Sequence, residues 1–163
     1  MPSHWKTEAP IAASRTLDGT TCFVPIQMLD TRLETCKEVG KAIGEAIRER
    51  REHSAKGRGK NDENSELPLI IASSDMSHYE QAAVAKEKDF KAIQRILDLD
   101  PEGLYRVVRE YGITMCGYGP AVAMLVACKL LGASKAELIK YTNSGDVSGD
   151  YDQVVGYAGI AVI

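Results

Sequence analysis

Asp75 and His78 lie close together in the segment SSDMSH, residues 73–78. If the chain turns there, the carboxylate can fix the tautomer of the imidazole, and the histidine can act as an acid, a base or a metal ligand. The segment follows an apolar run, and ligands of open α/β sheets bind at the carboxyl ends of strands. A DxxH pattern is also short and common, so a capped helix start with an exposed His78 stays equally open.

A cysteine next to glycine, Cys116 in the segment ITMCGYGP (residues 113–120), is the second candidate. It precedes an apolar helix and therefore lies near the positive end of a helix dipole, which favours the thiolate. A thiolate is both a nucleophile and a soft metal ligand. Gly117 and Gly119 would let backbone or a ligand approach closely. The pattern by itself favours the alternative, a structural cysteine in the loop before the helix.

Three aspartates, Asp146, Asp150 and Asp152, lie in a loop rich in glycine and serine and could bind a hard cation. Their spacing lacks the regular pattern and the closing glutamate of an EF-hand, so a polar loop between two strands is the better interpretation. The patterns GxxxxGK[ST], GxGxxG, HExxH and GxSxG do not occur. Their absence weakens the case for P-loop kinases, Rossmann dehydrogenases, zincins and α/β-hydrolases.

The elements that must position these residues follow the order strand, helix, strand, several helices and two final strands. The predicted strands cover residues 22–28, 67–74, 138–142 and 154–163. The predicted helices cover residues 31–52, 86–99, 101–111 and 120–131, and a capping box at 134–137 opens a further short helix. This order predicts a layered α/β domain over residues 22–163, preceded by a divergent segment 1–21 and interrupted by a flexible loop at 53–66.

Two of these elements carry most of the fold prediction. The run LPLIIASS (residues 67–74) is apolar without interruption, which predicts a strand buried on both faces in a largely parallel sheet. Residues 120–131 are apolar nearly all round and predict a central helix packed on several sides. Asp100 as N-cap, Pro101 as the first helical residue and Gly112 as the stop define the helix before it.

The composition is that of an ordinary globular domain. The chain has 163 residues, 44% hydrophobic and 26% charged residues and a net charge of −3, which excludes a disordered, collagen-like or coiled-coil chain and disfavours nucleic-acid binding. The basic run 48–60 is better explained as a solvated helix end and loop. Four cysteines without a CxxC pair predict no disulfide framework and hence a cytoplasmic location. Residues 1–20 lack a signal peptide's apolar region, and no apolar run is long enough to span a membrane.

Taken together, the strings SSDMSHYE, ITMCGYGP and VVGYAGIAVI resemble the Memo family, whose microbial members are called AmmeMemoRadiSam system protein B. The resemblance covers residues 22–163. It implies a fold related to class III extradiol dioxygenases, with helices on both faces of a sheet (α/β/α) and a metal ion at the strand ends. It also implies that Cys116 is a ligand of an iron or copper ion, and that Asp75 and His78 line the same cavity, where His78 can be a second ligand.

Family members are considerably longer, and their N-terminal half supplies further strands and histidine ligands in motifs such as GPSH. Here only the string PSH, ending at His4, corresponds to such a motif, so the chain resembles the C-terminal part of the family fold. We expect a metal-dependent redox enzyme with a small-molecule substrate or, alternatively, a non-catalytic adaptor. The family's system name implies AMMECR1-like and radical SAM proteins as partners. A partial sheet would also expose an apolar edge that favours self-association.

Overall fold

The computed structural model describes residues 15–16, 22–56 and 68–163 of the chain. The predicted segment 1–21, including His4, lies almost wholly outside these residues, as does most of the predicted loop 53–66. The elements are β1 (Arg15–Thr16), β2 (Cys22–Phe23), α1 (Leu33–Lys56), β3 (His78–Glu80), α2 (Ala82–Leu97), α3 (Pro101–Glu110), α4 (Tyr118–Leu130), β4 (Ala136–Asn143), α5 (Gly145–Ser148) and β5 (Val154–Val162).

The sheet is small and antiparallel. Strands β4 and β5 pair from Ala136 opposite Val162 to Asn143 opposite Gly156, and β3 pairs with the other edge of β5. Strands β1 and β2 form a separate antiparallel pair. Every strand pair of the described residues is therefore antiparallel, which corrects the predicted largely parallel sheet. The physical reason is local: β4 and β5 are joined by a short connection, which permits a hairpin but no parallel crossover.

Residues 68–77 form no strand, in contrast to the strand predicted over 67–74. Leu69 and Ile71 expose 83% and 78% of their surface, whereas Ile70 and Ala72 between them are partly buried. The segment thus keeps the alternation of a strand, with one face turned to solvent. The prediction that this segment is buried on both faces is therefore wrong. Burial of the second face would need a further layer of structure over Leu69 and Ile71, and the described residues place none there.

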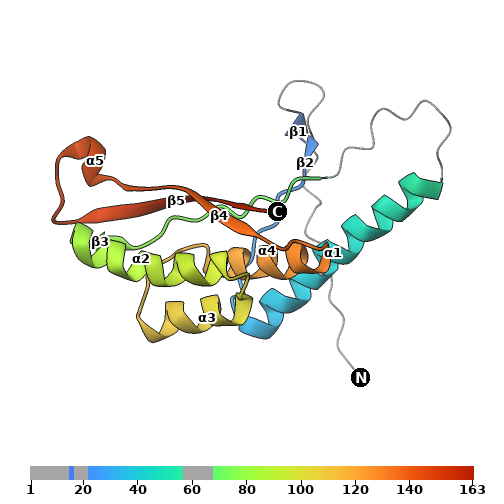
Figure 1. The fold of residues 1–163 in the computed structure, drawn as a ribbon, viewed down its shortest axis with the longest axis horizontal. Helices are drawn as coiled ribbons and strands as arrows, with labels where there is room; N and C mark the ends of the chain where they lie inside the picture. Colours follow the sequence, from blue (N-terminus) through green and yellow to red (C-terminus); the bar gives the residue numbers. More distant parts are fainter. Residues whose placement is uncertain (1–14, 17–21, 57–67) are drawn as a thin grey trace.

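The four long helices lie on one side of the β4–β5 hairpin (Figure 1). Helix α2 packs against both strands, α3 packs against α2 and α4, and α1 packs against α4. On the outer face of the hairpin, Ile139 exposes 67% and Tyr157 39% of its surface. The described residues therefore form an α/β arrangement with helices on one face, where the resemblance implied helices on both.

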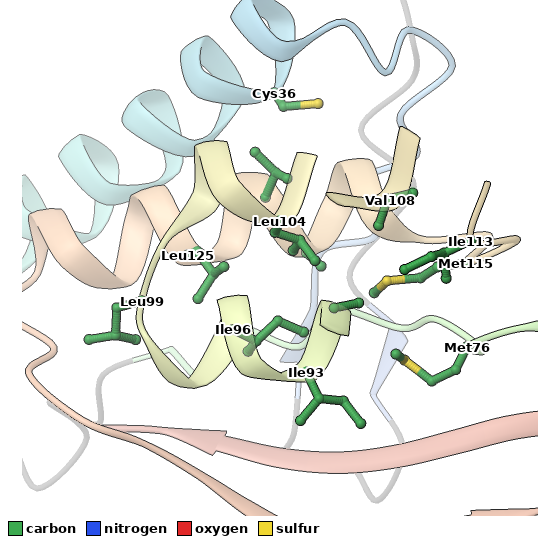
Figure 2. Close-up of a cluster of buried hydrophobic side chains, with 13 residues drawn as sticks. Cys36, Met76, Ile93, Ile96, Leu99, Leu104, Val108, Ile113, Met115 and Leu125 are labelled. Carbon is green, nitrogen blue, oxygen red and sulfur yellow. The ribbon is translucent and has the colours of Figure 1, made fainter. Parts of the chain in front are cut away.

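The core lies among α2, α3 and α4 (Figure 2). Its members come mainly from the helical stripes, where apolar residues recur every three or four positions. Met76 and Met115, from the two segments that carry the candidate site residues, belong to the same cluster. Full burial of one such side chain stabilises the fold by about 1.5–3 kcal/mol. The core therefore fixes both of these segments from within.

The helix signals between residues 100 and 132 are confirmed. The Asp100 carboxylate accepts the N–H of Gly103 at 2.8 Å, and Pro101 is the first residue of α3. Gly112 follows the helix with φ of +57°, the left-handed conformation that glycine adopts at no steric cost. Helix α4 is buried on most sides, as its apolar sequence predicts.

Two other local predictions are wrong. The capping box at 134–137 opens no helix, because the N–H groups of Ser134 and Lys135 donate to the carbonyl of Ile163 and β4 begins at Ala136. The strand predicted over 22–28 is limited to Cys22–Phe23, and Pro25, which follows two residues after Phe23, has no backbone N–H to donate to a neighbouring strand. No helix among the described residues combines the length and the apolar character needed to cross a bilayer.

We expect Gly40→Val to lower the free energy of unfolding by about 1–3 kcal/mol, the usual cost of overpacking. A Cβ atom at Gly40 would lie 2.7 Å from Cβ of Val126, so α1 and α4 could not keep their present contact. Urea unfolding followed by circular dichroism measures the change. Lys41→Ala, on the exposed side of α1, is the control and should stay within about 0.5 kcal/mol. Equal midpoints for the two variants would contradict the glycine contact.

Candidate metal centre

Three side chains with metal-binding atoms converge at one end of the sheet. His78 Nε2 lies 3.6 Å from Asp75 Oδ2, and the ligand atoms of Asp75, His78 and Cys116 all lie within 4.8 Å of one another. Asp75 and His78 come from the segment that leads into β3, and Cys116 comes from the loop between α3 and α4. The structure thus brings together the three residues that the sequence placed in two separate segments. Cys116 is exposed, and His78 is the most buried of the three.

The ring of His78 is held in one orientation by Thr114. His78 Nδ1 lies 2.8 Å from the carbonyl oxygen of Thr114. Because a carbonyl only accepts hydrogen bonds, Nδ1 is the protonated nitrogen, and in the neutral ring Nε2 keeps a free lone pair. The backbone N–H of His78 also donates to Thr114 Oγ1 at 2.7 Å. The free lone pair therefore faces Asp75, as in a histidine prepared to bind a metal.

The sulfur of Cys116 lies beside Ser74 and Asp75, in the segment that also carries His78. The N–H of Asp75 donates to Cys116 Sγ at 3.3 Å, and Ser74 Oγ lies 3.9 Å from the same sulfur. Cys116 also directly precedes Gly117, the N-cap of α4, so the positive end of that helix is close by. A metal binds the thiolate form of cysteine, and the N–H of Asp75 points at the sulfur that would carry this charge.

The two segments touch at Gly117. Its N–H donates to Ser74 Oγ at 2.8 Å, and the Ser74 hydroxyl in turn donates to the carbonyl of Asp75 at 2.7 Å. A Cβ atom at Gly117 would lie 2.6 Å from Cβ of Ser74. The close approach that the sequence predicted for this glycine is therefore one between two pieces of backbone, and it sets the separation of Cys116 from Asp75.

A backbone irregularity lies next to His78. Tyr79 has φ of +58°, which is uncommon for a residue with a side chain, and the pairing of β3 with β5 shifts register between His78 and Glu80. Such bulges re-aim side chains and are frequent beside functional sites. Here the irregularity lies next to His78, whose N–H and ring Nδ1 both bond to Thr114 instead of to a strand.

The remaining candidates do not join this group. In the acidic loop, Asp146 accepts hydrogen bonds from Thr142 Oγ1 and from the N–H of Asn143, and the first of these contributes most to a lowered pKa of Asp146. Asp150 accepts the N–H of Asp152. Within the part of the chain that the structure describes, these aspartates form no group that could hold a metal ion. They stabilise the turn between β4 and β5, in agreement with the polar-loop interpretation.

Sequence reasoning missed two residues that organise the site, Thr114 and Asp89. Thr114 acts on His78 mainly through its backbone carbonyl, for which no residue type is a signal. Asp89 is completely buried and accepts the N–H of Ser77 at 2.8 Å. A signal for Asp89 was present, because it follows Ala85 by four residues and precedes Ile93 by four, on the buried stripe of α2. A charged residue on such a stripe requires buried partners.

Comparison with known proteins gives one family. The profile of the Memo-like protein family matches residues 8–161. A MEMO1 family protein of Methanopyrus kandleri is 46% identical over 138 residues, which are 85% of this chain and 44% of the relative. A MEMO1 family protein of Methanocaldococcus jannaschii is 44% identical over 140 residues, 86% of this chain and 44% of the relative. The chain therefore spans less than half the length of these relatives.

We expect iodoacetamide to modify Cys116 before Cys36 and Cys128 in the folded protein. Cys116 is exposed, whereas burial raises the pKa of the Cys36 and Cys128 thiols and so keeps them from ionising near neutral pH. Their modification should need a higher pH than that of an ordinary thiol. Peptide mass spectrometry after timed reactions measures the order, and unfolding in urea should remove it. Modification of Cys36 ahead of Cys116 would contradict the structure.

Proposed function

The chain belongs to the Memo family, and from this membership we propose that it binds one iron or copper ion for a redox reaction on a small-molecule substrate. In this proposal Cys116 and His78 bind the ion, and Asp75 is the third ligand or the adjacent acid–base group. The observation that carries the proposal is the convergence of sulfur, nitrogen and oxygen donors within 4.8 Å. The kinship to class III extradiol dioxygenases that the resemblance implies is part of the same proposal.

The donor set fits such an ion. Thiolate, imidazole and carboxylate together suit a first-row transition metal, whereas magnesium and calcium prefer oxygen ligands alone. With metal–ligand bonds of about 2.0–2.3 Å, two ligands of one ion lie about 3–4 Å apart. The 3.6 Å between His78 Nε2 and Asp75 Oδ2 agrees with this separation. Small side-chain rotations would bring the widest pair, at up to 4.8 Å, into range.

Each residue has a distinct task in the proposed reaction. A bound iron or copper ion would supply a redox-active, electron-accepting centre beside the substrate. The hydrogen bond from Nδ1 to Thr114 keeps His78 Nε2 directed at the ion. Asp75 leaves 49% of its side chain exposed, so its Oδ2 can take a proton from a substrate group. Cys116, held by the N–H of Asp75, presents the sulfur.

A second candidate function, the non-catalytic adaptor, is favoured by a different observation. Leu69 and Ile71 expose most of their apolar surface on a segment with strand-like alternation. A partner strand can pair with the backbone of such a segment, and the partner's side chains can cover its apolar face. The relatives are more than twice as long as the matched part, so another polypeptide segment can cover this face. AMMECR1-like and radical SAM proteins are the partners proposed for an adaptor.

We expect the wild-type protein to bind close to one iron or copper ion per chain after anaerobic reconstitution. Cys116→Ser and His78→Ala should each weaken binding by at least about tenfold, because each removes one of three donors. Affinity should fall as the pH is lowered, because protons compete for the histidine and thiolate ligands. Elemental analysis after gel filtration measures the stoichiometry, and Cys128→Ser is the matched control. A wild-type protein without stoichiometric metal would end this proposal.

For the adaptor function, the double variant Leu69→Thr, Ile71→Thr should associate less than the wild type. Light scattering over a concentration series measures the association, because exposed apolar strands pair more as concentration rises. Val147→Thr is the control, since Val147 is 94% exposed but lies in α5. A wild-type protein that stays monomeric at all concentrations would indicate that the exposed surface of Leu69 and Ile71 does not drive association.

A further inference from the structure

A completely buried aspartate contacts the segment that carries two of the candidate ligands. Asp89, on α2, has no exposed surface. Its Oδ1 accepts the N–H of Ser77 at 2.8 Å, and its Oδ2 accepts the hydroxyl proton of Tyr141 at 2.8 Å. A buried carboxylate is costly unless it is hydrogen-bonded, so each oxygen depends on its partner. The carboxylate thereby ties the segment to α2 and to β4.

The N–H groups of residues 75–78 are bound by three different parts of the molecule: the loop before α4, strand β5 and helix α2. The N–H of Asp75 donates to Cys116 Sγ, and that of Met76 donates to the carbonyl of Gly156. The N–H of Ser77 donates to Asp89, and that of His78 donates to Thr114 Oγ1. Asp89 is the only one of these acceptors that is a buried charge. Without it, the N–H of Ser77 would be left unpaired inside the core.

Glycine at position 156 leaves room for the Asp89 carboxylate to accept its hydrogen bonds from Ser77 and Tyr141. A Cβ atom there would overlap Oδ2 of Asp89 and would lie 3.1 Å from the Tyr141 hydroxyl. The N–H of Gly156 donates to the carbonyl of Ser77, so β5 and the carboxylate hold the same residue from two directions. Burial and Asp89 also raise the pKa of Tyr141, which keeps its hydroxyl protonated as a donor. The Tyr141 hydroxyl therefore remains a hydrogen-bond donor to Asp89.

We propose that Asp89 is a positioning residue that sets the placement of Asp75 and His78 relative to Cys116, and that metal affinity depends on it. The inference rests on the proposed function. Asp89 acts through the backbone of Ser77, since the Ser77 hydroxyl is buried and has no hydrogen-bond partner within the described residues. The serine side chain is thus dispensable for this role, and the aspartate is not.

The test is a Co²⁺ titration followed by the thiolate-to-metal absorption band. Asp89→Ala should weaken binding by at least about tenfold, the effect of removing a support of a metal ligand. Asp89→Asn should retain most of the affinity, because the amide oxygen can accept from Ser77 and the amide nitrogen can donate to Tyr141. Ser77→Ala should bind as the wild type does. Ile96→Ala, a core truncation on the same helix, controls for a general loss of stability.

A second readout needs no metal. Nitrogen NMR of the imidazole rings reports which nitrogen of His78 is protonated, and the chain has only three histidines to assign. Asp89→Ala should shift His78 from the Nδ1–H form towards a mixture of tautomers, and Ile96→Ala should not. If the wild type binds no Co²⁺, the proposed metal function fails, and the tautomer measurement alone decides on Asp89.

Two results would overturn the role of Asp89. The first is an Asp89→Ala variant that binds Co²⁺ as tightly as the wild type and keeps the His78 proton on Nδ1. The second is an Ile96→Ala variant that loses affinity and tautomer preference as much as Asp89→Ala does, which would indicate instability alone. Should Asp89→Ala not fold, Tyr141→Phe replaces it. That variant keeps the bond to Ser77 but leaves one carboxylate oxygen unpaired, so a smaller loss of affinity is expected. Unchanged affinity and tautomer in Tyr141→Phe would then count against the proposal.

Discussion

The backbone N–H groups of residues 75–78 must find hydrogen-bond partners although only part of the segment lies beside a strand, β5, and the structure is organised around that requirement. Buried N–H groups are almost always paired in folded proteins. Here the partners are a thiol, a strand carbonyl, a buried carboxylate and a threonine hydroxyl. Meeting them forces the segment to bend between α2, β5 and the loop before α4. The bend is what brings His78 and Cys116 together.

The apolar core supports the same arrangement from the other side. Met76 lies between Asp75 and His78 in one segment, and Met115 directly precedes Cys116 in the other. Both methionines are buried in one cluster with the stripes of α2, α3 and α4. The packing that stabilises the fold therefore also determines where Asp75, His78 and Cys116 lie. Stability and site geometry thus depend on neighbouring residues of the same two segments, so a change in the packing of Met76 or Met115 would also shift the candidate ligands.

The sequence was most informative where the signals are local. Asp100, Pro101 and Gly112 determine the ends of α3 through contacts within a few residues, and the apolar run of α4 needs only a surrounding core. The candidate ligands were found because their side chains have chemistry of their own. The strand prediction over 67–74 was wrong because strand pairing depends on segments that are distant in the sequence. The role of Thr114 could not be predicted, because it orients the ring of His78 through its backbone carbonyl, a group common to every residue type.

The dependence of His78 on a main-chain carbonyl has a consequence for redesign. Since Thr114 orients the ring through its backbone carbonyl, that acceptor stays in place whatever side chains stand at positions 75 and 116. The donor atoms at positions 75 and 116 can then be exchanged for harder or softer ligands while the imidazole keeps its direction. The candidate centre thus combines a fixed nitrogen with two adjustable positions, so exchanges at positions 75 and 116 would change the metal preference of the proposed site.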